Sequence, residues 1–219
     1  MKQYNPEVKM VWTTPNAEGV IIDCARVSSS KSAGMPDNGL IRYLITHNHW
    51  SPFEMSNICL EITGVPRDIT RQLLRHGSFH FQEFSQRYAD TASLGGLIGR
   101  ECRMQDPNNR QNSLDATDPA LIEWWNATLK CIGAEATNLY TEALGKGIAK
   151  EVARAILPEG MTPTRMFVNG TVRDWIHYVR VRRTNDAQAE HQELAQKIAD
   201  QLYHIIPRIS SVAFEDMAD

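Results

Sequence analysis

The sequence predicts an α+β fold of mixed type, rich in helices, in a single domain that spans residues 1–219. Three observations support this prediction. Residues 57–63 alternate apolar and polar side chains, as a half-buried strand does. Residues 119–144 repeat apolar side chains at helical spacing. The length fits the usual range for one domain, and no repeat, low-complexity tail or linker divides the chain.

The first part of the chain combines one clear strand with one ambiguous segment. Residues 8–13 (VKMVWT) predict a strand, whereas the apolar run at 19–29 is compatible with either a strand or a helix. Serine, glycine and proline at 28–39 predict a loop. Asp37 or Asn38 is then expected to cap a helix, because both side chains accept hydrogen bonds from a free helix start.

A short helix and a long loop follow the strand at 57–63. Pro66 is expected to be the first residue of this helix, which runs to about residue 76. Gly77 is expected to close it in the left-handed conformation. Residues 93–113 contain three glycines and many polar side chains and predict a long loop, a type of segment that is often functional.

The rest of the chain is predicted to be mainly helical. Asp118 and Pro119 form the cap and first turn of a helix that continues to about Leu144. Its side chains at helical spacing are expected in the core: Leu121, Trp125, Leu129, Ile132, Ala136 and Leu139. Two more helices are expected at 148–157 and 186–206, each ending at a proline.

Composition excludes several classes of protein. Hydrophobic residues at 42% and charged residues at 22% are ordinary for globular proteins. No apolar run approaches the roughly 20 residues of a membrane span, and the N-terminus lacks the apolar region of a secretory signal. We therefore expect a cytoplasmic protein. The cysteines are scattered without a CxxC pair, so we expect reduced thiols and no metal.

Arginine clusters indicate the kind of ligand. The net charge of −3 argues against long nucleic acids, but arginines gather at 67–76 and 173–183. Such clusters in a mildly acidic protein favour a small anion. Arg67, Arg71 and Arg75 share one helical face, which is equally compatible with a solvated surface and with a phosphate or carboxylate that bridges them.

Residues 75–88 (RHGSFHFQEFSQRY) combine ring surface with hydrogen-bonding groups. The stretch interleaves Phe79, Phe81 and Phe84 with His80, Gln82 and Glu83. A flat heteroaromatic ligand with phosphates would suit this mixture, because rings stack on its faces while amides and charges bind its edges. A core strand with polar residues toward water is the alternative, but it leaves Ser85, Arg87 and Tyr88 unexplained.

The second arginine cluster also has two interpretations. One helical stripe holds Arg173, Ile176, Arg180 and Arg183, and Arg182 lies about 100° around from it. An exposed basic face is the usual meaning. Contact with a ligand or another subunit is the alternative, because buried arginines need anionic partners.

Other motifs point away from common catalytic sites. His47 and His49 are two residues apart, which is the wrong spacing for two metal ligands on one helical face. The sequence has no GxSxG elbow, no GxxxxGK[ST] loop and no GxGxxG after a strand. The residues by themselves therefore indicate an enzyme for an anionic aromatic ligand.

The segment RQLLRHGSFHFQEFSQRY (71–88) resembles the signature of flavin-dependent thymidylate synthases, which is Arg-His-Arg, seven residues, Ser, and then Arg-Tyr. Supporting segments occur in the family's order: CARVSS, HNHWSPFE, RAILP and RTNDAQAEHQE. They extend over most of residues 22–195. The resemblance implies a central sheet flanked by helices, and a homotetramer with active sites at subunit contacts.

The resemblance also implies the residues of the site. Those around dUMP would be Gln72, Arg75, Glu83, Ser85, Arg87, Arg154 and Arg182. Those around FAD would be Ser51, Arg75, His76, Glu83, Arg173 and His177, with His49 near flavin and folate. Arg182 is also the implied catalytic residue, with Arg183 as the alternative, because a guanidinium near uracil favours the ionised ring nitrogen.

The chemistry that the resemblance implies is transfer of a one-carbon unit from methylenetetrahydrofolate to C5 of dUMP, with FAD reduced by NADPH. The location would be the cytoplasm, or the host cytoplasm for a viral protein. No enzyme nucleophile is needed. One departure is Gly77, which stands where the motif has its second arginine and could weaken FAD binding by about 1–3 kcal/mol.

Two alternatives remain open at this point. The first is a related enzyme that methylates or hydroxymethylates a different pyrimidine nucleotide. The second is a non-catalytic nucleotide-binding or RNA-binding relative in which the motif has decayed at Gly77. Steep salt dependence of binding would indicate RNA.

Overall fold

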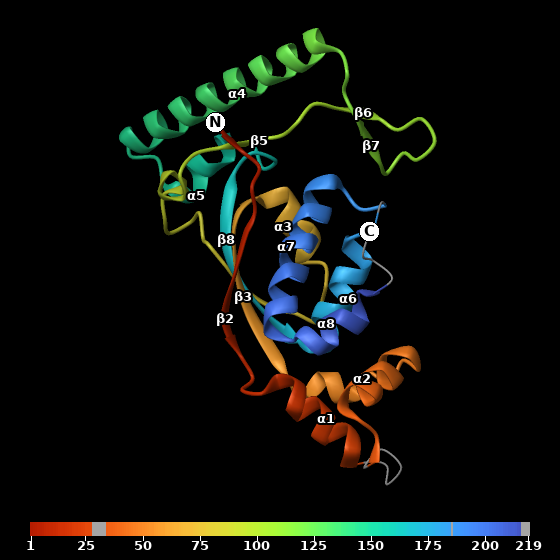
Figure 1. Ribbon diagram of the computed structural model, residues 1–219. Helices are drawn as coiled ribbons and strands as arrows, with labels where there is room; N and C mark the ends of the chain where they lie inside the picture. Colours follow the sequence, from red (N-terminus) through yellow and green to blue (C-terminus); the bar gives the residue numbers. More distant parts are fainter. Residues whose placement is uncertain (28–33, 185, 216–219) are drawn as a thin grey trace.

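A computed structural model describes residues 1–27, 34–184 and 186–215. Its main feature is a four-stranded antiparallel sheet in the order β2-β3-β8-β4 (Figure 1). The strands are β2 (Glu7–Thr13), β3 (Asn57–Pro66), β8 (Pro163–Thr171) and β4 (His80–Glu83). The predicted strands at 8–13 and 57–63 are confirmed.

Eight helices of the described residues pack beside this sheet or at its ends. They are α1 (Ala17–Val27), α2 (Asp37–Thr46), α3 (Arg67–Leu73), α4 (Pro119–Gly145), α5 (Lys150–Ala153), α6 (Val172–Arg182), α7 (Ala189–Ile205) and α8 (Pro207–Ala213). Figure 1 shows α3, α6 and α7 beside the sheet, α1 and α2 at one end and α4 across the other end. The α+β prediction is confirmed.

Strand β3 carries the centre of the core. Ile58, Leu60 and Ile62 are fully buried, as their alternation predicts. The register of β3 against β8 shifts between Ile62 and Val65. Gly64 lies in this irregularity with φ +71°, and a Cβ there would lie 2.4 Å from the Asn5 carbonyl oxygen. A side chain at position 64 would therefore be both strained and obstructed.

Strand β8 was not predicted, although it pairs with both β3 and β4. Its signal was present, because Thr164, Met166 and Val168 are buried while Arg165 between them is exposed. The segment at 19–29, which sequence left open, contains helix α1 up to Val27; from residue 28 it lies outside the described residues. The predicted loop at 28–39 also falls partly outside them.

Helix α6 joins the sheet to the predicted site. The buried Trp175 donates a hydrogen bond from Nε1 to the carbonyl oxygen of Ile58, at 3.0 Å. Its ring lies 4.5 Å from that of Phe79, centroid to centroid. These contacts hold the residues after α3 against the buried side of α6.

Three predicted helix ends, on two helices, are wrong. The cap of α2 is Pro36, without a side-chain hydrogen bond, because Asp37 instead binds Arg26 and Arg208 at 2.8 and 3.1 Å. Helix α3 has Pro66 as its cap, not as its first residue, and it ends at Leu73. Gly77 lies beyond that end, and its φ is not positive.

Helix α4 confirms its predicted cap but only part of its predicted core. The Asp118 carboxylate accepts a hydrogen bond from the Ala120 amide at 2.9 Å. Leu129 and Ala136 are buried and Trp125 is half-buried. Trp124, Ile132 and Leu139 are 60, 46 and 43% exposed and form what we call the α4 stripe. The core prediction was wrong for Ile132 and Leu139.

The remaining predicted helices are shorter than expected. The helix at 148–157 is α5 followed by the 3₁₀ turn η4 (Arg154–Ile156), and α7 begins only at Ala189. Pro207 ends α7 and at once begins α8, since proline fits a first helical turn. Within the described residues no helix is long and apolar enough to cross a membrane.

The predicted long loop at 93–113 contains short regular elements. Those in or at the borders of this loop are η3 (Thr91–Leu94), β5 (Ile98–Gly99), β6 (Arg103–Gln105) and β7 (Ser113–Asp115). Two further short elements lie elsewhere: β1 (Lys2–Gln3) at the N-terminus and the 3₁₀ turn η2 (Ser51–Met55) after α2. Strands β6 and β7 form an antiparallel hairpin, and β5 pairs with β1. The hairpin approaches α7 through Asn109, which donates a hydrogen bond to Asp186 at 3.2 Å.

Candidate functional site

Arg182 and His76 form the centre of the candidate site. Arg182, at the end of α6, donates a hydrogen bond from Nε to Nε2 of His76 at 3.0 Å. Burial, together with the charges of Arg182, His177 and Arg75, lowers the pKa of His76 to about 4. His76 is therefore neutral near pH 7, which leaves Nε2 as an acceptor and the proton on Nδ1.

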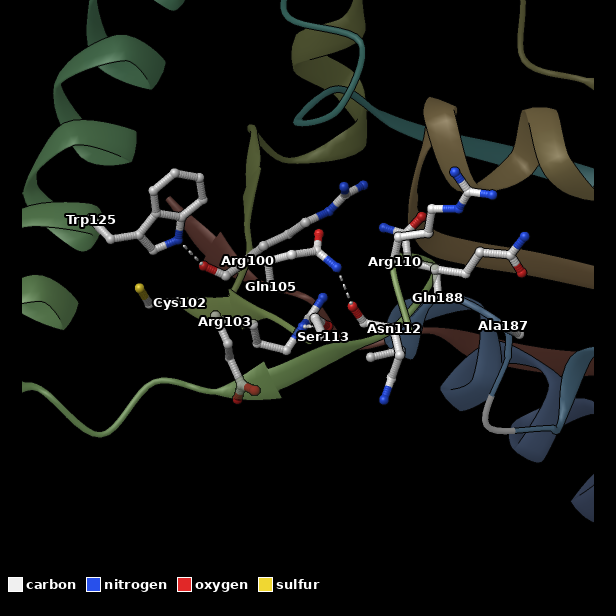
Figure 2. Close-up of a pocket in the computed structure, with 13 residues that line it drawn as sticks. Arg100, Cys102, Arg103, Gln105, Arg110, Asn112, Ser113, Trp125, Ala187 and Gln188 are labelled. Carbon is white, nitrogen blue, oxygen red and sulfur yellow. Dashed lines mark hydrogen bonds between the residues drawn. The ribbon is translucent and has the colours of Figure 1, made fainter. Parts of the chain in front are cut away.

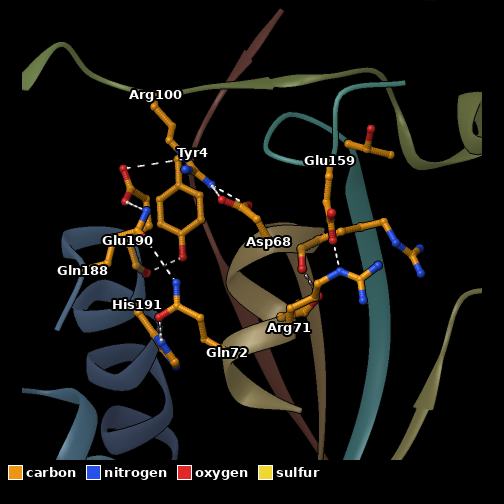
Figure 3. A network of polar contacts seen from close by, with 12 residues as sticks. Tyr4, Asp68, Arg71, Gln72, Arg100, Glu159, Gln188, Glu190 and His191 are labelled. Atoms are coloured by element: carbon orange, nitrogen blue, oxygen red, sulfur yellow. Dashed lines mark hydrogen bonds and ion pairs between the residues drawn. The ribbon is translucent and has the colours of Figure 1, made fainter. Parts of the chain in front are cut away.

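Gln72, on α3, connects this helix to the start of α7. Its Nε2 donates to Oε1 of Gln188 at 2.8 Å, and its Oε1 lies 3.2 Å from Nδ1 of His191 (Figure 3). His191 also contacts the hydroxyl of Tyr178, at 2.9 Å from Nε2. The ring of Tyr178 meets the ring of His76 edge-on, with centroids 5.1 Å apart.

A second group of predicted residues gathers at the end of β4 and around α5. Arg87 donates from Nε to a carboxylate oxygen of Glu151, and Arg154 donates from Nε to its backbone oxygen, both at 3.3 Å. Ser85 is close, because its Oγ accepts the Arg87 amide at 3.4 Å. The structure thus places serine and two arginines together, a combination suited to a phosphate.

Glu83 connects β4 to α3. Its carboxylate accepts a hydrogen bond from Thr164 at 2.9 Å and pairs with Arg67 at 3.2 Å. The predicted common face of three arginines is not formed. Arg67 pairs with Glu83, Arg71 pairs with Glu159, and Arg75 is exposed beyond the end of the helix. Helix α3 is too short to carry all three.

A cavity of about 570 Å³ lies beside α6. Part of the predicted stripe faces it, since Arg173, Ile176 and Arg180 are lining residues but Arg183 is not. His177, from the same helix, also lines it. The guanidinium of Arg180 lies 5.5 Å from the ring centroid of Trp50, a cation–π distance. The other members of the lining are Asn48, Trp50, Glu54, Ser78 and Asp174.

The predicted residues Ser51 and His49 flank Trp50 in the chain. Ser51 begins η2, and the ring of His49 lies 5.7 Å from that of Tyr43 and 6.1 Å from that of His47, centroid to centroid. Neither is a lining residue of the cavity among the described residues. Their place next to Trp50 nevertheless keeps both at its border.

Sequence reasoning missed the polar network on the other side of Gln188. Glu190 is 3% exposed and forms ion pairs with Arg103 and, at 4.0 Å, with Arg100. Arg100 also binds the Asp68 carboxylate at 2.5 Å. The only available signal was the charged AEHQE segment, whose buried polar residues cannot be told from solvated ones by spacing.

This network borders a second cavity, of about 370 Å³, between the β6–β7 hairpin and the start of α7 (Figure 2). Gln188 lies in its wall with Arg100, Arg103 and Arg110. Trp125 closes one side and donates from Nε1 to the Arg100 carbonyl oxygen at 2.9 Å. Part of the predicted functional loop at 93–113 thus lines a cavity next to Gln188, which bonds to Gln72.

A model of the family described as thymidylate synthase complementing protein matches residues 9–208 of this chain. The chain belongs to the flavin-dependent thymidylate synthase family. One relative in this family is a probable flavin-dependent thymidylate synthase of Paramecium bursaria Chlorella virus 1, 43% identical over 196 residues, 89% of each chain. Another is a flavin-dependent thymidylate synthase of Synechocystis sp., 45% identical over 190 residues, 87% of this chain and 86% of the relative.

Solved structures extend the family's fold to this chain. A UMP/dUMP methylase PolB from Streptomyces cacaoi, crystallised with 5-Br dUMP, superposes with a TM-score of 0.83. The match covers 99% of this chain and 97% of that one at 22% identity, and therefore shows the shared fold. The residues of the flavin-dependent thymidylate synthase signature thus stand in a fold of the expected type.

Proposed function

We propose that this chain converts dUMP to dTMP, with methylenetetrahydrofolate as one-carbon donor and NADPH-reduced FAD as reductant. The observation that carries this proposal is the contact between Arg182 and His76, 106 residues apart in sequence. These are the residues that the family resemblance assigns to the nucleotide and to the flavin. Relatives with 43 and 45% identity that bear the family's name support the same reading.

Arg182 is the proposed catalytic residue. Its bond to His76 uses Nε and leaves both terminal nitrogens without another hydrogen bond among the described residues. A guanidinium held in this way can donate to the uracil edge and favour the ionised form of the ring nitrogen. Gln72 would bind the same nucleotide from α3, and Ser85, Arg87 and Arg154 its phosphate.

The residues beside α6 fit FAD. Arg180 and Arg173, which pairs with Glu54, would supply cationic donors for a pyrophosphate. Trp50 and the neutral His76 would supply ring surface for an isoalloxazine. When bound and reduced, FAD supplies the electrons that complete the methyl group. Position 77 borders this region and is open, because a Cβ at Gly77 would meet no atom within 4 Å.

The proposed assembly is a homotetramer with sites shared between subunits. Within the described residues no hydrogen bond or ion pair joins the Ser85–Arg87–Arg154 group to Arg182 or His76. Two copies can supply the two groups to one site. The α4 stripe offers an exposed apolar surface for such contacts, since exposed apolar patches often mark protein–protein interaction sites.

The proposal is tested by the absorbance spectrum of the purified protein with FAD, followed by anaerobic addition of NADPH with and without dUMP. We expect a yellow protein that bleaches faster with dUMP, and dTMP as product once methylenetetrahydrofolate is added. Failure to take up flavin would overturn the proposal. If the protein turns over dCMP and not dUMP, the proposed substrate is wrong but the proposed flavin chemistry stands.

Shared sites are tested by mixing two inactive variants, Arg182→Ala and Ser85→Ala, under conditions that exchange subunits. If the two groups come from different copies, mixed assemblies contain some intact sites and recover activity. A mixture of Arg182→Ala with Gln72→Ala is the matched control and should stay inactive, because both changes fall in the same group. Equal inactivity of both mixtures would contradict sharing.

A further inference from the structure

Glu190 is a buried carboxylate with a fixed role in hydrogen bonding. It is 3% exposed and pairs with Arg103. Burial by itself raises the pKa of Glu190, but the hydrogen bonds from Arg103 and Gln188 and the positive charge of Arg103 lower it below its usual range. The carboxylate is therefore ionised near pH 7 and can only accept hydrogen bonds.

This acceptor determines the orientation of the next two amides. Nε2 of Gln188 donates to the Glu190 carboxylate at 2.8 Å, so the Oε1 of Gln188 must accept. Nε2 of Gln72 donates to that oxygen at 2.8 Å. The Oε1 of Gln72 is consequently an acceptor toward α7 (Figure 3).

His191 completes this series of hydrogen bonds, between Gln72 and Tyr178. Its Nδ1 lies 3.2 Å from Oε1 of Gln72, so Nδ1 carries the proton. Burial lowers the pKa of His191 to about 3, and the ring is therefore neutral. Its Nε2 then accepts the Tyr178 hydroxyl at 2.9 Å. Every donor from Tyr178 to Glu190 points toward the carboxylate.

The two ends of this hydrogen-bonded series are buried. His191 and Tyr178 are fully buried, and Glu190 is nearly so, whereas Gln72 and Gln188 are half-buried. Gln72 keeps one N–H of its amide and one lone pair of its oxygen for a ligand, since each end of the amide uses one partner inside the protein. A free glutamine amide could present either end equally well.

We propose that Glu190 and His191 are positioning residues that hold the Gln72 amide in one orientation for the pyrimidine nucleotide. The inference rests on the proposed function, in which Gln72 binds dUMP. An amide that is fixed before binding costs less conformational entropy to engage, and it presents the same donor and acceptor to each ligand. His191 acts through Gln72 without touching the nucleotide.

The test is a double-mutant cycle on dUMP affinity, measured by titration calorimetry of the full-length protein. His191→Leu removes the donor to Gln72 and should weaken dUMP binding about tenfold, the loss of roughly one hydrogen bond. In the Gln72→Ala background the same change should weaken binding less than about twofold. His191→Asn should rescue affinity, because its amide nitrogen can replace Nδ1.

Tyr178→Phe is the matched control. It removes a buried hydrogen bond to the same histidine but leaves the donor to Gln72, so it should lower stability while dUMP affinity stays within about twofold. An equal loss from His191→Leu in both backgrounds would overturn the positioning role while the proposed function stands. No dUMP binding by the unmodified protein would instead overturn the proposed function and this inference together.

Discussion

The Nε of Arg182 and the Nε2 of His76 lie 3.0 Å apart, which joins the end of α6 to the segment after α3. The bond can form only while His76 is neutral at Nε2. It also fixes the plane of the guanidinium, since Nε and the terminal nitrogens are coplanar. Replacing either partner should therefore affect geometry as well as charge.

Arg182→Lys should lower kcat/KM on the order of 100-fold, because lysine keeps the charge but loses the planar set of donors. Steady-state rates of dTMP formation give this ratio. Arg183→Lys is the control, since Arg183 is adjacent in sequence and was the alternative from sequence reasoning. A larger loss from the change at 183 would reverse the assignment.

Gly77→Arg should increase FAD affinity by about 1–3 kcal/mol, if the new guanidinium makes charge-assisted bonds to the cofactor. The position is exposed, has no positive φ and has free space for a Cβ, so stability should change by less than about 0.5 kcal/mol. Flavin titration measures the affinity. Gly77→Ala serves as control, and an equal gain from alanine would assign the effect to the backbone.

Glu190→Gln should lower the free energy of unfolding by about 3 kcal/mol, because it leaves the guanidinium of Arg103 partly buried without its counter-charge. Glu7→Gln removes the exposed pair with Lys9 and should cost less than about 1 kcal/mol. Urea unfolding at one protein concentration compares the two. Similar costs would show that burial does not strengthen the Glu190 pair.

Acid should destabilise the protein through His191. Its folded-state pKa of about 3 lies below the usual value of 6.5, so between these pH values only the unfolded state binds the proton. Stability is unaffected by this group above pH 6.5 and falls as the pH drops, by about 2 kcal/mol at pH 5. His76 acts in the same direction.

The measurement is urea unfolding at pH 7.5 and pH 5. The loss between the two pH values should be smaller by about 2 kcal/mol in His191→Asn, which has no titratable group at that position. His204→Asn removes an exposed histidine from the same helix and should leave the loss unchanged. An unchanged loss in His191→Asn would contradict the buried neutral ring.

Ile132→Lys with Leu139→Lys should dissociate the proposed assembly without unfolding the subunit, because both side chains are already exposed in one copy. Light scattering after size exclusion measures the mass, and circular dichroism checks the helices. Ala134→Lys, on another exposed side of α4, is the control. An unchanged mass in the double variant would assign the α4 stripe to a different role.

The sequence by itself determined the elements that depend on local chemistry. The alternation at 57–63 predicted β3, and Asp118 before Pro119 predicted the start of α4, because strand periodicity and helix capping involve neighbours in the chain. The signature at 71–88 identified the family through residue types at fixed spacing. These features need no knowledge of distant contacts.

Only the tertiary structure decided which side chains meet. The partners Gln72 and Gln188 are 116 residues apart, and Gln72 and His191 are 119 apart, so no spacing rule could join them. Periodicity likewise showed an apolar side on α4, but not whether another element covers it. Ile132, which periodicity placed in the core, is exposed. Hydrogen-bond partners and burial are properties of the packed chain, because they depend on which elements the fold brings together.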